Sequence, residues 1–349
     1  MTLRASLVRI RASLPRAVGN ARRGWLTREG LALTVTDGAC EGHAEAAPLP
    51  GFSPDSLEAA ERALSALPWD RIDLDDDDPL TLAARHLGDD VPAARFALET
   101  ALLDLAARRR GLSVGAMLGA SDRVASIRSA ALIDDLDNAV AHALSAIAAG
   151  AQALKVKIGR LGRGDDEAAL LRTLRRELGE DVLLRVDANG ALSGRSDPLI
   201  PVLAEVNVEF CEEPFALEDL LAGPPLPVPV GLDESLAHRP ERALRALDRG
   251  LASVVVLKPA LLGGMGRALA FAESANTRGA RALISHLFDP PRAFAACGQL
   301  ALALGDESVH GLGSYAGLNA WTSASGLAVD VPRAIGPYRI ERSTAPGLG

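Results

Sequence analysis

Five short apolar segments between residues 154 and 259 each end in charged residues, and this repeat constrains the fold more than any other feature of the sequence. Successive charged positions lie about 20 to 30 residues apart, the length of one strand, one helix and two loops. Buried parallel strands read as short apolar runs rich in β-branched residues. The pattern therefore predicts repeated β/α units. The charged residues are Lys155, Lys157, Asp187, Glu212, Glu213, Asp233, Glu234 and Lys258.

Repeated β/α units of this kind commonly close into a barrel, whose chemistry lies at the C-terminal ends of the strands. The charged residues fall at those ends, so we expect an α/β fold with a TIM-type barrel. Lys155 and Lys157 are two residues apart, and both side chains therefore point to the same face of their strand, the barrel interior. Further barrel strands are expected at residues 125–133, 281–286 and 309–315.

Asp187, Glu212 and Asp233 are the candidate metal ligands. Burial of an unpaired carboxylate is very costly, and three carboxylates on adjacent strands repel one another unless a cation lies between them. Carboxylate oxygens suit a hard divalent ion, so we expect Mg²⁺, or Mn²⁺ in its place. The alternative is that each carboxylate caps a helix or lies on a solvated loop. Charges at the ends of five consecutive units favour a shared site.

The first 118 residues do not follow the β/α repeat. Strand-like alternation of apolar residues with other residues at 7–12 and 31–36 predicts an antiparallel sheet. A loop at Pro48–Ser53 precedes a helix capped by Ser53 or Asp55, and the spacing of apolar residues predicts a long helix over 92–112. A chain of 349 residues exceeds a barrel by about 100 residues. We expect an α+β capping domain at 1–118, completed by a closing segment at 326–349, and a barrel domain at 119–325.

The composition narrows the class of partner. A formal net charge of −8 argues against nucleic acid and anionic membranes as partners and favours a small molecule. No uninterrupted apolar run is long enough for a membrane span, and three separated cysteines suit a cytoplasmic location. Alternation at Val8–Arg11 favours a folded first strand over a transit peptide. The chain can form a homo-oligomer, a state that the composition does not decide.

Five motifs together resemble the enolase superfamily, in its muconate-cycloisomerase branch. They are the Lys155–x–Lys157 strand, the VDAN segment with Asp187 and Asn189, EEP at Glu212, DES at Asp233 and LKP at Lys258. Within that branch, the segment 45–64 and the Arg185–x–Asp187 pair look most similar to the o-succinylbenzoate synthases of menaquinone biosynthesis. The resemblance covers nearly the whole chain and implies a modified barrel with a capping domain, whose loops near Arg22–Thr27 and Pro48–Ser53 close over the substrate.

The resemblance implies a role for each matching residue. Asp187, Glu212 and Asp233 would bind Mg²⁺, Lys157 would be the catalytic base and Lys258 the opposing catalytic lysine. Glu213 and Glu234 would point away from the metal. The reaction implied is a lyase reaction, the dehydration of 2-succinyl-6-hydroxy-2,4-cyclohexadiene-1-carboxylate by proton abstraction next to a carboxylate. The supporting or substrate-binding residues would be Lys155, which keeps Lys157 deprotonatable, and Arg185, Asn189, Ser285, Gly311, Gly313 and Phe52.

Two positions qualify the resemblance. His286 stands on the seventh strand where a serine-rich segment is usual, and we expect a structural or substrate-lining role for it because Lys258 holds the place where an aspartate partner would be needed. On the eighth strand, Gly311 and Gly313 leave backbone N–H groups free to meet an anion. That strand has no Asp-x-Asp of the kind that binds a dipeptide ammonium.

Other activities stay open from the sequence. N-acylamino acid racemases, dipeptide epimerases and cycloisomerases of the same superfamily use lysines on opposite faces of the substrate. The absence of an Asp-x-Asp counts against the dipeptide case. A barrel without catalysis, acting as a binding protein, is disfavoured because all five polar motifs are present.

Overall fold

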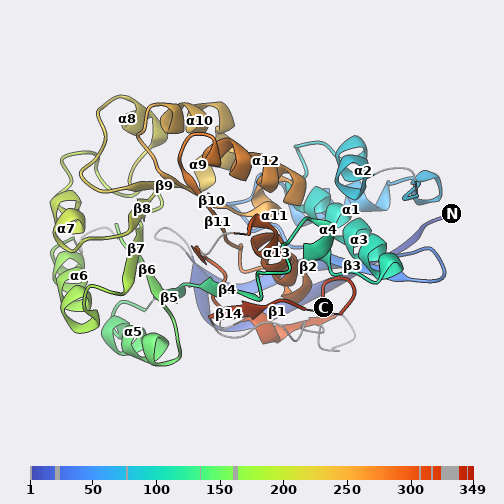
Figure 1. The fold of residues 1–349 in the computed structure, drawn as a ribbon, viewed down its shortest axis with the longest axis horizontal. Helices are drawn as coiled ribbons and strands as arrows, with labels where there is room; N and C mark the ends of the chain where they lie inside the picture. The colour runs from blue at the N-terminus through green and yellow to red at the C-terminus, as the bar shows by residue number, and fades with distance from the viewer. Residues whose placement is uncertain are drawn as a thin grey trace.

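A computed structural model describes residues 2–19, 24–75, 78–133, 135–159, 164–305, 308–315, 317–323, 338–343 and 345–349. Two parts are visible in Figure 1. A curled parallel sheet with helices on its outer side lies to the left, and an antiparallel sheet with its own helices lies to the right. The architecture is the expected one, a modified TIM-type barrel beside an α+β cap.

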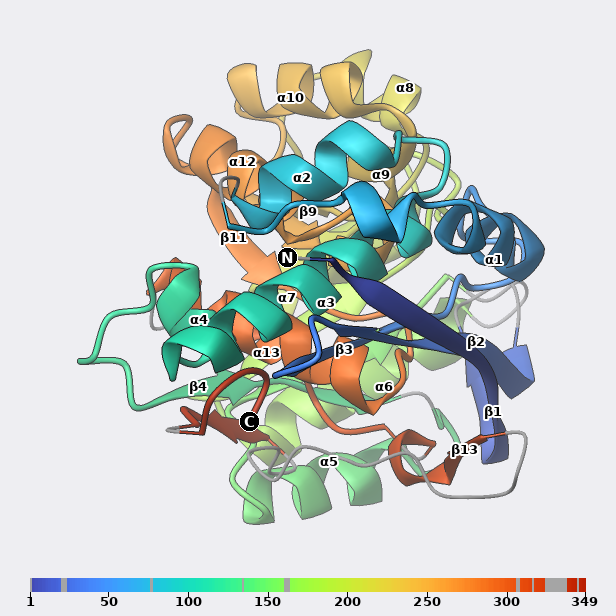
Figure 2. The ribbon, with the colours of Figure 1, turned by 90° about the vertical axis from the view of Figure 1, so that its right-hand side faces the viewer.

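The cap is built on a four-stranded antiparallel sheet in the order β13-β1-β2-β3. Its strands are β1 (Arg4–Gly19), β2 (Gly24–Thr36), β3 (Glu41–Ala46) and β13 (Trp321–Ser323). The β1–β2 hairpin is longer than the alternation suggests, because β2 begins at Gly24, well before the expected strand at 31–36. Figure 2 looks onto this part and shows α3 beside the hairpin.

The helices of the cap are α1 (Leu57–Ser65), α2 (Pro79–His86), α3 (Pro92–Arg110) and α4 (Val114–Met117), with a 3₁₀ turn at Trp69–Arg71. The long helix α3 ends at Gly111, whose φ of 67° is the left-handed conformation that terminates helices. Leucine and alanine side chains of α3 pack on the sheet and make a second hydrophobic core, separate from that of the barrel.

The expected cap of α1 was wrong. Ser56, and neither Ser53 nor Asp55, accepts a hydrogen bond from the Ala59 N–H of the first turn, at 3.1 Å. Asp55 instead accepts from the Ala93 N–H at the start of α3, at 3.0 Å. A buried carboxylate needs hydrogen-bond donors, and the unpaired N–H groups of a neighbouring helix supply them.

Seven parallel strands make the barrel sheet, in the order β11-β10-β9-β8-β7-β6-β5. Strands that are neighbours in the sheet are also consecutive in the chain. Each β/α unit therefore adds the next strand, as the repeat predicted. They are β5 (Ala131–Ile133), β6 (Ala153–Lys157), β7 (Leu183–Asp187), β8 (Phe210–Glu212), β9 (Val230–Leu232), β10 (Val254–Leu257) and β11 (Arg281–Ile284).

The barrel departs from expectation where it closes. The expected strand 125–133 is broken at Ala130 into β4 (Ser126–Ser129) and β5. The expected eighth strand is only β12 (Val309–His310), which pairs with β4. A single bridge between Ser285 and Gly311 joins that segment to the end of β11. Glycines at 311 and 313 give little side-chain packing to hold a regular strand.

Helices connect the barrel strands and lie outside them. In the part of the chain that the structure describes, none of the helices is long and apolar enough to cross a membrane. The helices are α5 (Ala139–Ala148), α6 (Gly164–Leu178), α7 (Leu199–Glu205), α8 (Leu217–Leu221), α9 (Glu234–His238), α10 (Pro240–Asp248), α11 (Pro259–Leu262), α12 (Met265–Asn276) and α13 (Pro291–Leu304), with a 3₁₀ turn at Leu318–Ala320.

The closing segment expected at 326–349 lies partly outside the described residues. Its described part contributes β14 (Arg339–Glu341), which pairs antiparallel with β4. The last residues reach the cap, where the Leu348 N–H donates to Asp104 of α3 at 2.8 Å. The domain limits 1–118, 119–325 and 326–349 stay a prediction.

Candidate active site

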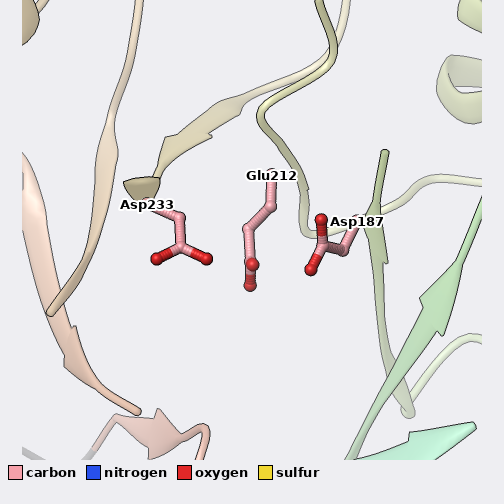
Figure 3. A group of neighbouring side chains, drawn as sticks. All are labelled: Asp187, Glu212 and Asp233. Carbon is pink, nitrogen blue, oxygen red and sulfur yellow. The ribbon is translucent and has the colours of Figure 1, made fainter. Parts of the chain in front are cut away.

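Three carboxylates converge at the C-terminal ends of adjacent strands. Asp187 ends β7, Glu212 ends β8 and Asp233 directly follows β9. Asp187 and Glu212 are register partners in the sheet. Each of the three offers an oxygen, and these oxygens lie within 4.8 Å of one another. The side chains point into one common space in Figure 3, and all three are buried.

Three lysines surround this group. The Lys155 Nζ lies 2.7 Å and 3.0 Å from the two carboxylate oxygens of Glu212 and 3.0 Å from Oδ2 of Asp187. Lys157 donates to Asp187 at 2.5 Å and to the side-chain oxygen of Asn189 at 3.1 Å. Lys258, which follows β10, donates to Asp233 from the opposite side. Three ammonium groups thus balance three carboxylates in a buried place.

The electrostatics follow from this packing. Burial disfavours the charge of Lys155, but the carboxylates of Asp187 and Glu212 outweigh burial and raise its pKa. Lys155 is therefore a permanent cation in the cluster. Burial likewise opposes the ionised form of Asp187, yet Lys155 and Lys157 hold the pKa of this carboxyl below its usual range. Lys155 and Asp187 make a fixed charge pair beside Lys157.

Glu213 and Glu234 follow Glu212 and Asp233 in the sequence and were expected to point away from the metal ligands. The Glu213 Oε1 accepts hydrogen bonds from the Asp233 N–H at 2.8 Å and the Ser235 N–H at 3.0 Å. Its Oε2 accepts from the Ser235 hydroxyl at 2.7 Å. Glu213 therefore holds the backbone of Asp233 in place. Burial is the main cause that raises the pKa of both Glu213 and Glu234 to about 7.

The donor set fits a hard divalent cation. All the converging ligand atoms are carboxylate oxygens, the preferred ligands of Mg²⁺. The Oδ1 atom of Asp233 is buried and has no hydrogen-bond partner among the described residues. A buried carboxylate oxygen without a donor is costly, and a metal ion bound there would satisfy it.

A pocket opens above the carboxylates and is lined by both parts of the molecule. Strand ends of the barrel form its floor, and the cap contributes one wall. All seven residues expected to support the site or bind substrate line this pocket. The lining residues from the cap are Val18, Gly19, Trp25, Leu49 and Phe52, and those from the barrel are Ala130, Leu132, Lys155, Lys157, Arg185, Asn189, Glu212, Val256, Lys258, Leu283, Ser285, His286, Leu287, Phe288, Gly311, Gly313, Ser314 and Tyr315.

Two of the expected supporting residues have well-defined partners. The Nζ of Lys258 lies 5.4 Å from the ring centre of Phe52, so a ring from the cap faces a lysine of the barrel. Arg185 donates to Glu209 at 2.6 Å and lies over the ring of Phe210 at 5.0 Å. Arg185 therefore sits low in the barrel interior, two residues before the metal-ligand candidate Asp187.

One expectation for the eighth strand was wrong. The Gly311 N–H donates to the Ile284 carbonyl at 2.8 Å and is not free to meet an anion. The Ser285 hydroxyl donates to the Gly311 carbonyl at 3.1 Å. These groups form the bridge between the seventh and eighth strands, and the barrel closes where the eighth strand, β12, pairs with β4.

His286 lies in an aromatic cluster on the pocket wall. Its ring stacks on Tyr315 at 5.5 Å and meets the edge of Phe294 at 4.7 Å. The Nδ1 atom accepts a hydrogen bond from the Phe288 N–H at 3.1 Å. Burial, followed by the charges of Lys258 and Lys155, lowers the pKa of His286 to about 3. The ring is therefore neutral at neutral pH and is held by its own loop.

Three pocket residues from barrel loops, Leu287, Phe288 and Tyr315, were not expected from the sequence. Aromatic residues directly after the seventh strand are a signal for Phe288 that the repeat analysis did not use. The resemblance implied that cap loops near 22–27 and 48–53 close over the substrate, and Trp25, Leu49 and Phe52 from the described part of these loops line the pocket.

Residues 138–349 match the family described as "Enolase C-terminal domain-like", and residues 4–105 match the N-terminal domain of MenC. The chain belongs to the enolase superfamily. The first match covers the barrel from α5 onward, with all three carboxylates and all three lysines, and the second covers most of the cap. The enzymes of this superfamily bind Mg²⁺ at a site of acidic residues, and Asp187, Glu212 and Asp233 form a group of acidic residues whose oxygens could hold such an ion.

Individual relatives carry several activities. The chain is 28% identical over 300 residues to an o-succinylbenzoate synthase of Citrobacter koseri, covering 82% of each chain. It is 30% identical over 193 residues to an N-succinylamino acid racemase of Thermus thermophilus, covering 53% of this chain and 51% of the racemase. Several other curated relatives are likewise matched over less than two thirds of their length.

A solved structure gives the same fold over the whole chain. The dipeptide epimerase of Methylococcus capsulatus, complexed with Mg and the dipeptide L-Arg-D-Lys, superposes with a TM-score of 0.80 at 26% sequence identity. The superposition covers 100% of this chain and 99% of the epimerase. The protein is therefore an enzyme of the enolase superfamily, with relatives that are synthases, racemases and epimerases.

Proposed function

We propose that the protein is a magnesium-dependent o-succinylbenzoate synthase of menaquinone biosynthesis. It would dehydrate 2-succinyl-6-hydroxy-2,4-cyclohexadiene-1-carboxylate to o-succinylbenzoate. The observation that carries this proposal is the match of residues 4–105 to the MenC N-terminal domain. That segment supplies Trp25, Leu49 and Phe52 to the pocket wall, and the succinyl part of the substrate would lie against it.

The charge of the pocket supports the same choice. Of the described residues that line it, Glu212 alone carries a carboxylate, and this carboxylate belongs to the proposed metal ligands. The substrate ammonium of a dipeptide would find no counter-charge on the remaining wall. A substrate with two carboxylates suits a pocket lined by Lys155, Lys157 and Lys258.

Asp187, Glu212 and Asp233 would hold the magnesium ion, and Glu213 would fix Asp233 through its backbone N–H. Bound there, Mg²⁺ supplies positive charge next to the substrate carboxylate and makes the neighbouring C–H more acidic. Asp187 and Asp233 would have to exchange their hydrogen bonds with lysine for bonds to the ion. The lysines are then released toward the substrate.

The proton transfers are assigned to Lys157. In its neutral form, the Nζ accepts the proton of the carbon that bears the carboxylate, and the C–H electron pair stays with the substrate. The C–O bond to the ring hydroxyl then breaks, and the same Nζ returns the proton so that the hydroxyl leaves as water. The ring becomes aromatic. Lys258, opposite Lys157, contributes a positive charge that stabilises the anion between the two steps.

Racemisation of N-acylamino acids is the second candidate. Lys157 and Lys258 reach the pocket from opposite sides, beside Asp187 and Asp233, which is the arrangement that removal and return of a proton on two faces requires. An N-succinylamino acid has an α-proton next to a carboxylate and no ammonium. The similarity to a racemase of that name supports this candidate.

The deciding experiment offers both substrates to the purified protein with Mg²⁺. We expect aromatisation of the cyclohexadiene, followed by absorbance, at a kcat/KM at least about 10-fold above that for racemisation of N-succinylamino acids. Protein that racemises these amino acids efficiently and does not aromatise the cyclohexadiene would contradict the synthase proposal. EDTA should abolish both reactions.

A further inference from the structure

Arg28 is a buried cap residue whose side chain binds backbone carbonyls of both domains. It lies on β2, and the residue is 1% exposed. Its guanidinium donates to the Ala47 carbonyl at 2.6 Å and the Pro48 carbonyl at 3.1 Å, both in the cap. It also donates to the Leu287 carbonyl at 3.3 Å and the Phe288 carbonyl at 3.4 Å, both in the barrel. One side chain therefore joins two segments that are far apart in the sequence.

Both segments contribute to the pocket wall. Ala47 and Pro48 lead directly into the turn of residues 49–53, which contributes Leu49 and Phe52 to the pocket. This turn is closed on itself, because the Phe52 and Ser53 N–H groups both donate to the Leu49 carbonyl. Leu287 and Phe288 line the pocket themselves. Arg28 touches no atom of the metal-ligand group but reaches the backbone that carries both parts of the wall.

A second set of donors binds the barrel segment at the same point. The Tyr315 hydroxyl lies 3.2 Å from the Phe288 carbonyl and 2.8 Å from the Asp289 carbonyl. The Trp321 ring N–H donates to this hydroxyl at 2.7 Å. Trp321 belongs to β13, which pairs with β1 of the cap, and the Arg28 guanidinium lies 6.0 Å from its ring centre. The 287–289 backbone is therefore held from the cap sheet on two sides.

The chemistry of this contact requires an arginine. A guanidinium presents five N–H donors in a rigid plane, whereas a lysine ammonium has three on one atom. Four carbonyls spread over two segments can be reached by the planar group and not by a single ammonium. Phe288 also has a φ of 54°, a conformation that a non-glycine residue adopts at a cost and keeps only where its surroundings hold it.

We propose that Arg28 is a positioning residue that fixes the Phe52 turn against the 287–289 segment and thereby sets this wall of the substrate pocket. The identity of the substrate rests on the proposed function, but the contact of Arg28 with the two segments does not. Because the residues of this wall transfer no proton in the proposed reaction, loosening it raises KM more than it lowers kcat.

The test compares Arg28→Lys with a matched control, Arg175→Lys. Arg175 on α6 is also buried, and it also donates to four backbone carbonyls, those of Val206, Gly179, Val182 and Asn207. It does not line the pocket. We expect both variants to lose thermal stability, while only Arg28→Lys raises the KM for the cyclohexadiene, by about 10-fold with kcat changed less than about 3-fold. An equal KM in wild type and Arg28→Lys would overturn the proposal.

Hydrogen exchange gives a readout that needs no substrate. In Arg28→Lys, the amides of Phe52, Ser53 and Phe288 should exchange at least about 10-fold faster, and in Arg175→Lys they should be unchanged. Unchanged exchange at these amides would also overturn the proposal. If wild type does not aromatise the cyclohexadiene, the proposed function fails, and exchange still decides the role of Arg28.

A second variant covers the case in which Arg28→Lys does not fold. Tyr315→Phe removes only the hydroxyl that binds the Phe288 and Asp289 carbonyls. The same two readouts should change in the same direction, with a smaller rise in KM of about 3-fold. Wild-type exchange at the Phe288 amide in Tyr315→Phe would contradict the idea that this backbone is held by its carbonyls.

Discussion

The Nζ of Lys157 lies 2.5 Å from Oδ2 of Asp187, its register partner across β6 and β7. The proposed base and a proposed metal ligand thus contact each other directly. At such a short distance in a buried place, the charge of one strongly influences the other. A substitution at either residue therefore alters both metal binding and proton transfer, so each prediction about this site needs separate readouts for the two.

Asp233→Asn should abolish magnesium binding and lower activity at least about 100-fold, while the fold stays intact. The substitution removes one of three converging carboxylates and leaves the backbone that Glu213 holds. Wild type should gain thermal stability with added Mg²⁺, because an ion that binds the folded state stabilises it. The variant should not gain it, and circular dichroism should be that of wild type.

Asp248→Asn is the control for that prediction. Asp248 is an exposed residue that pairs with Arg278 at 2.6 Å, on α10 and away from the pocket. It should keep wild-type activity and the Mg²⁺-dependent gain in stability, since exposed ion pairs contribute little. Wild-type turnover by Asp233→Asn would exclude Asp233 as a metal ligand.

Glu45→Gln should change how stability depends on pH. Glu45, at the contact of β3 with α13, accepts from the N–H groups of Arg292 and Ala293, but its Oε1 has no partner among the described residues. Burial outweighs those N–H groups and raises the pKa of Glu45 to about 7. Below the unfolded pKa, the carboxyl is protonated in both states. As pH rises toward 7, only the unfolded chain ionises, and stability falls.

The free energy of unfolding from urea titrations between pH 4.5 and 8 checks this prediction. Wild type should lose about 3 kcal/mol more than Glu45→Gln over this range, because one pKa unit corresponds to about 1.4 kcal/mol. Glu273→Gln, a change at an exposed carboxyl on α12, is the control and should follow wild type. Parallel curves for wild type and Glu45→Gln would contradict the assignment.

Phe52→Ala should weaken substrate binding. The ring lines the pocket and lies 5.4 Å from Nζ of Lys258, and both contacts are lost in the variant. We expect a KM at least about 5-fold higher, from the loss of about 1 kcal/mol or more of apolar contact between the ring and the substrate. Leu26→Ala, a change at an exposed leucine of the cap, should leave KM unchanged. An unchanged KM in Phe52→Ala would exclude contact with the substrate.

The floor of the site was predictable because its geometry is local and periodic. Each strand end is fixed by its own apolar run, and parallel strands bring their C-terminal ends to one edge. Asp187, Glu212 and Asp233 therefore converge without knowledge of the rest of the fold. The second glutamate of EEP was predictable for the same reason, since residue 213 must point away from the face of residue 212.

The pocket wall that the cap and the barrel loops form was not predictable in the same way. Arg28 and Phe288 meet because the cap docks on barrel loops, and no spacing in the sequence records that approach. Asp55 was misread because its partners are the N–H groups of α3, nearly 40 residues away, and not those of the next helix. The Gly311 N–H was misread because an unpaired strand end was assumed where the barrel closes.

Substitutions at the two lysines should separate elimination from racemisation. In racemisation, the proton leaves on one face and returns on the other, so Lys157 and Lys258 must both carry protons. In elimination with one base, Lys157 alone carries them, and Lys258 need only be a cation next to the anion. Arginine keeps the charge but does not give up its proton. We therefore expect no activity in Lys157→Ala or Lys157→Arg, and measurable dehydration in Lys258→Arg.

Aromatisation followed by absorbance, in parallel with loss of optical rotation of an N-acylamino acid, measures both reactions on each variant. Lys258→Arg should retain dehydration and lose all racemisation, whereas Lys258→Ala should lose both because Asp233 and the anion then lack their cation. Exchange of the α-proton with deuterated solvent gives a third readout, which Lys157 should support on one face even in Lys258→Arg. Loss of both reactions in a folded Lys258→Arg that still binds Mg²⁺ would mean that Lys258 transfers a proton during dehydration, and the one-base mechanism would be wrong.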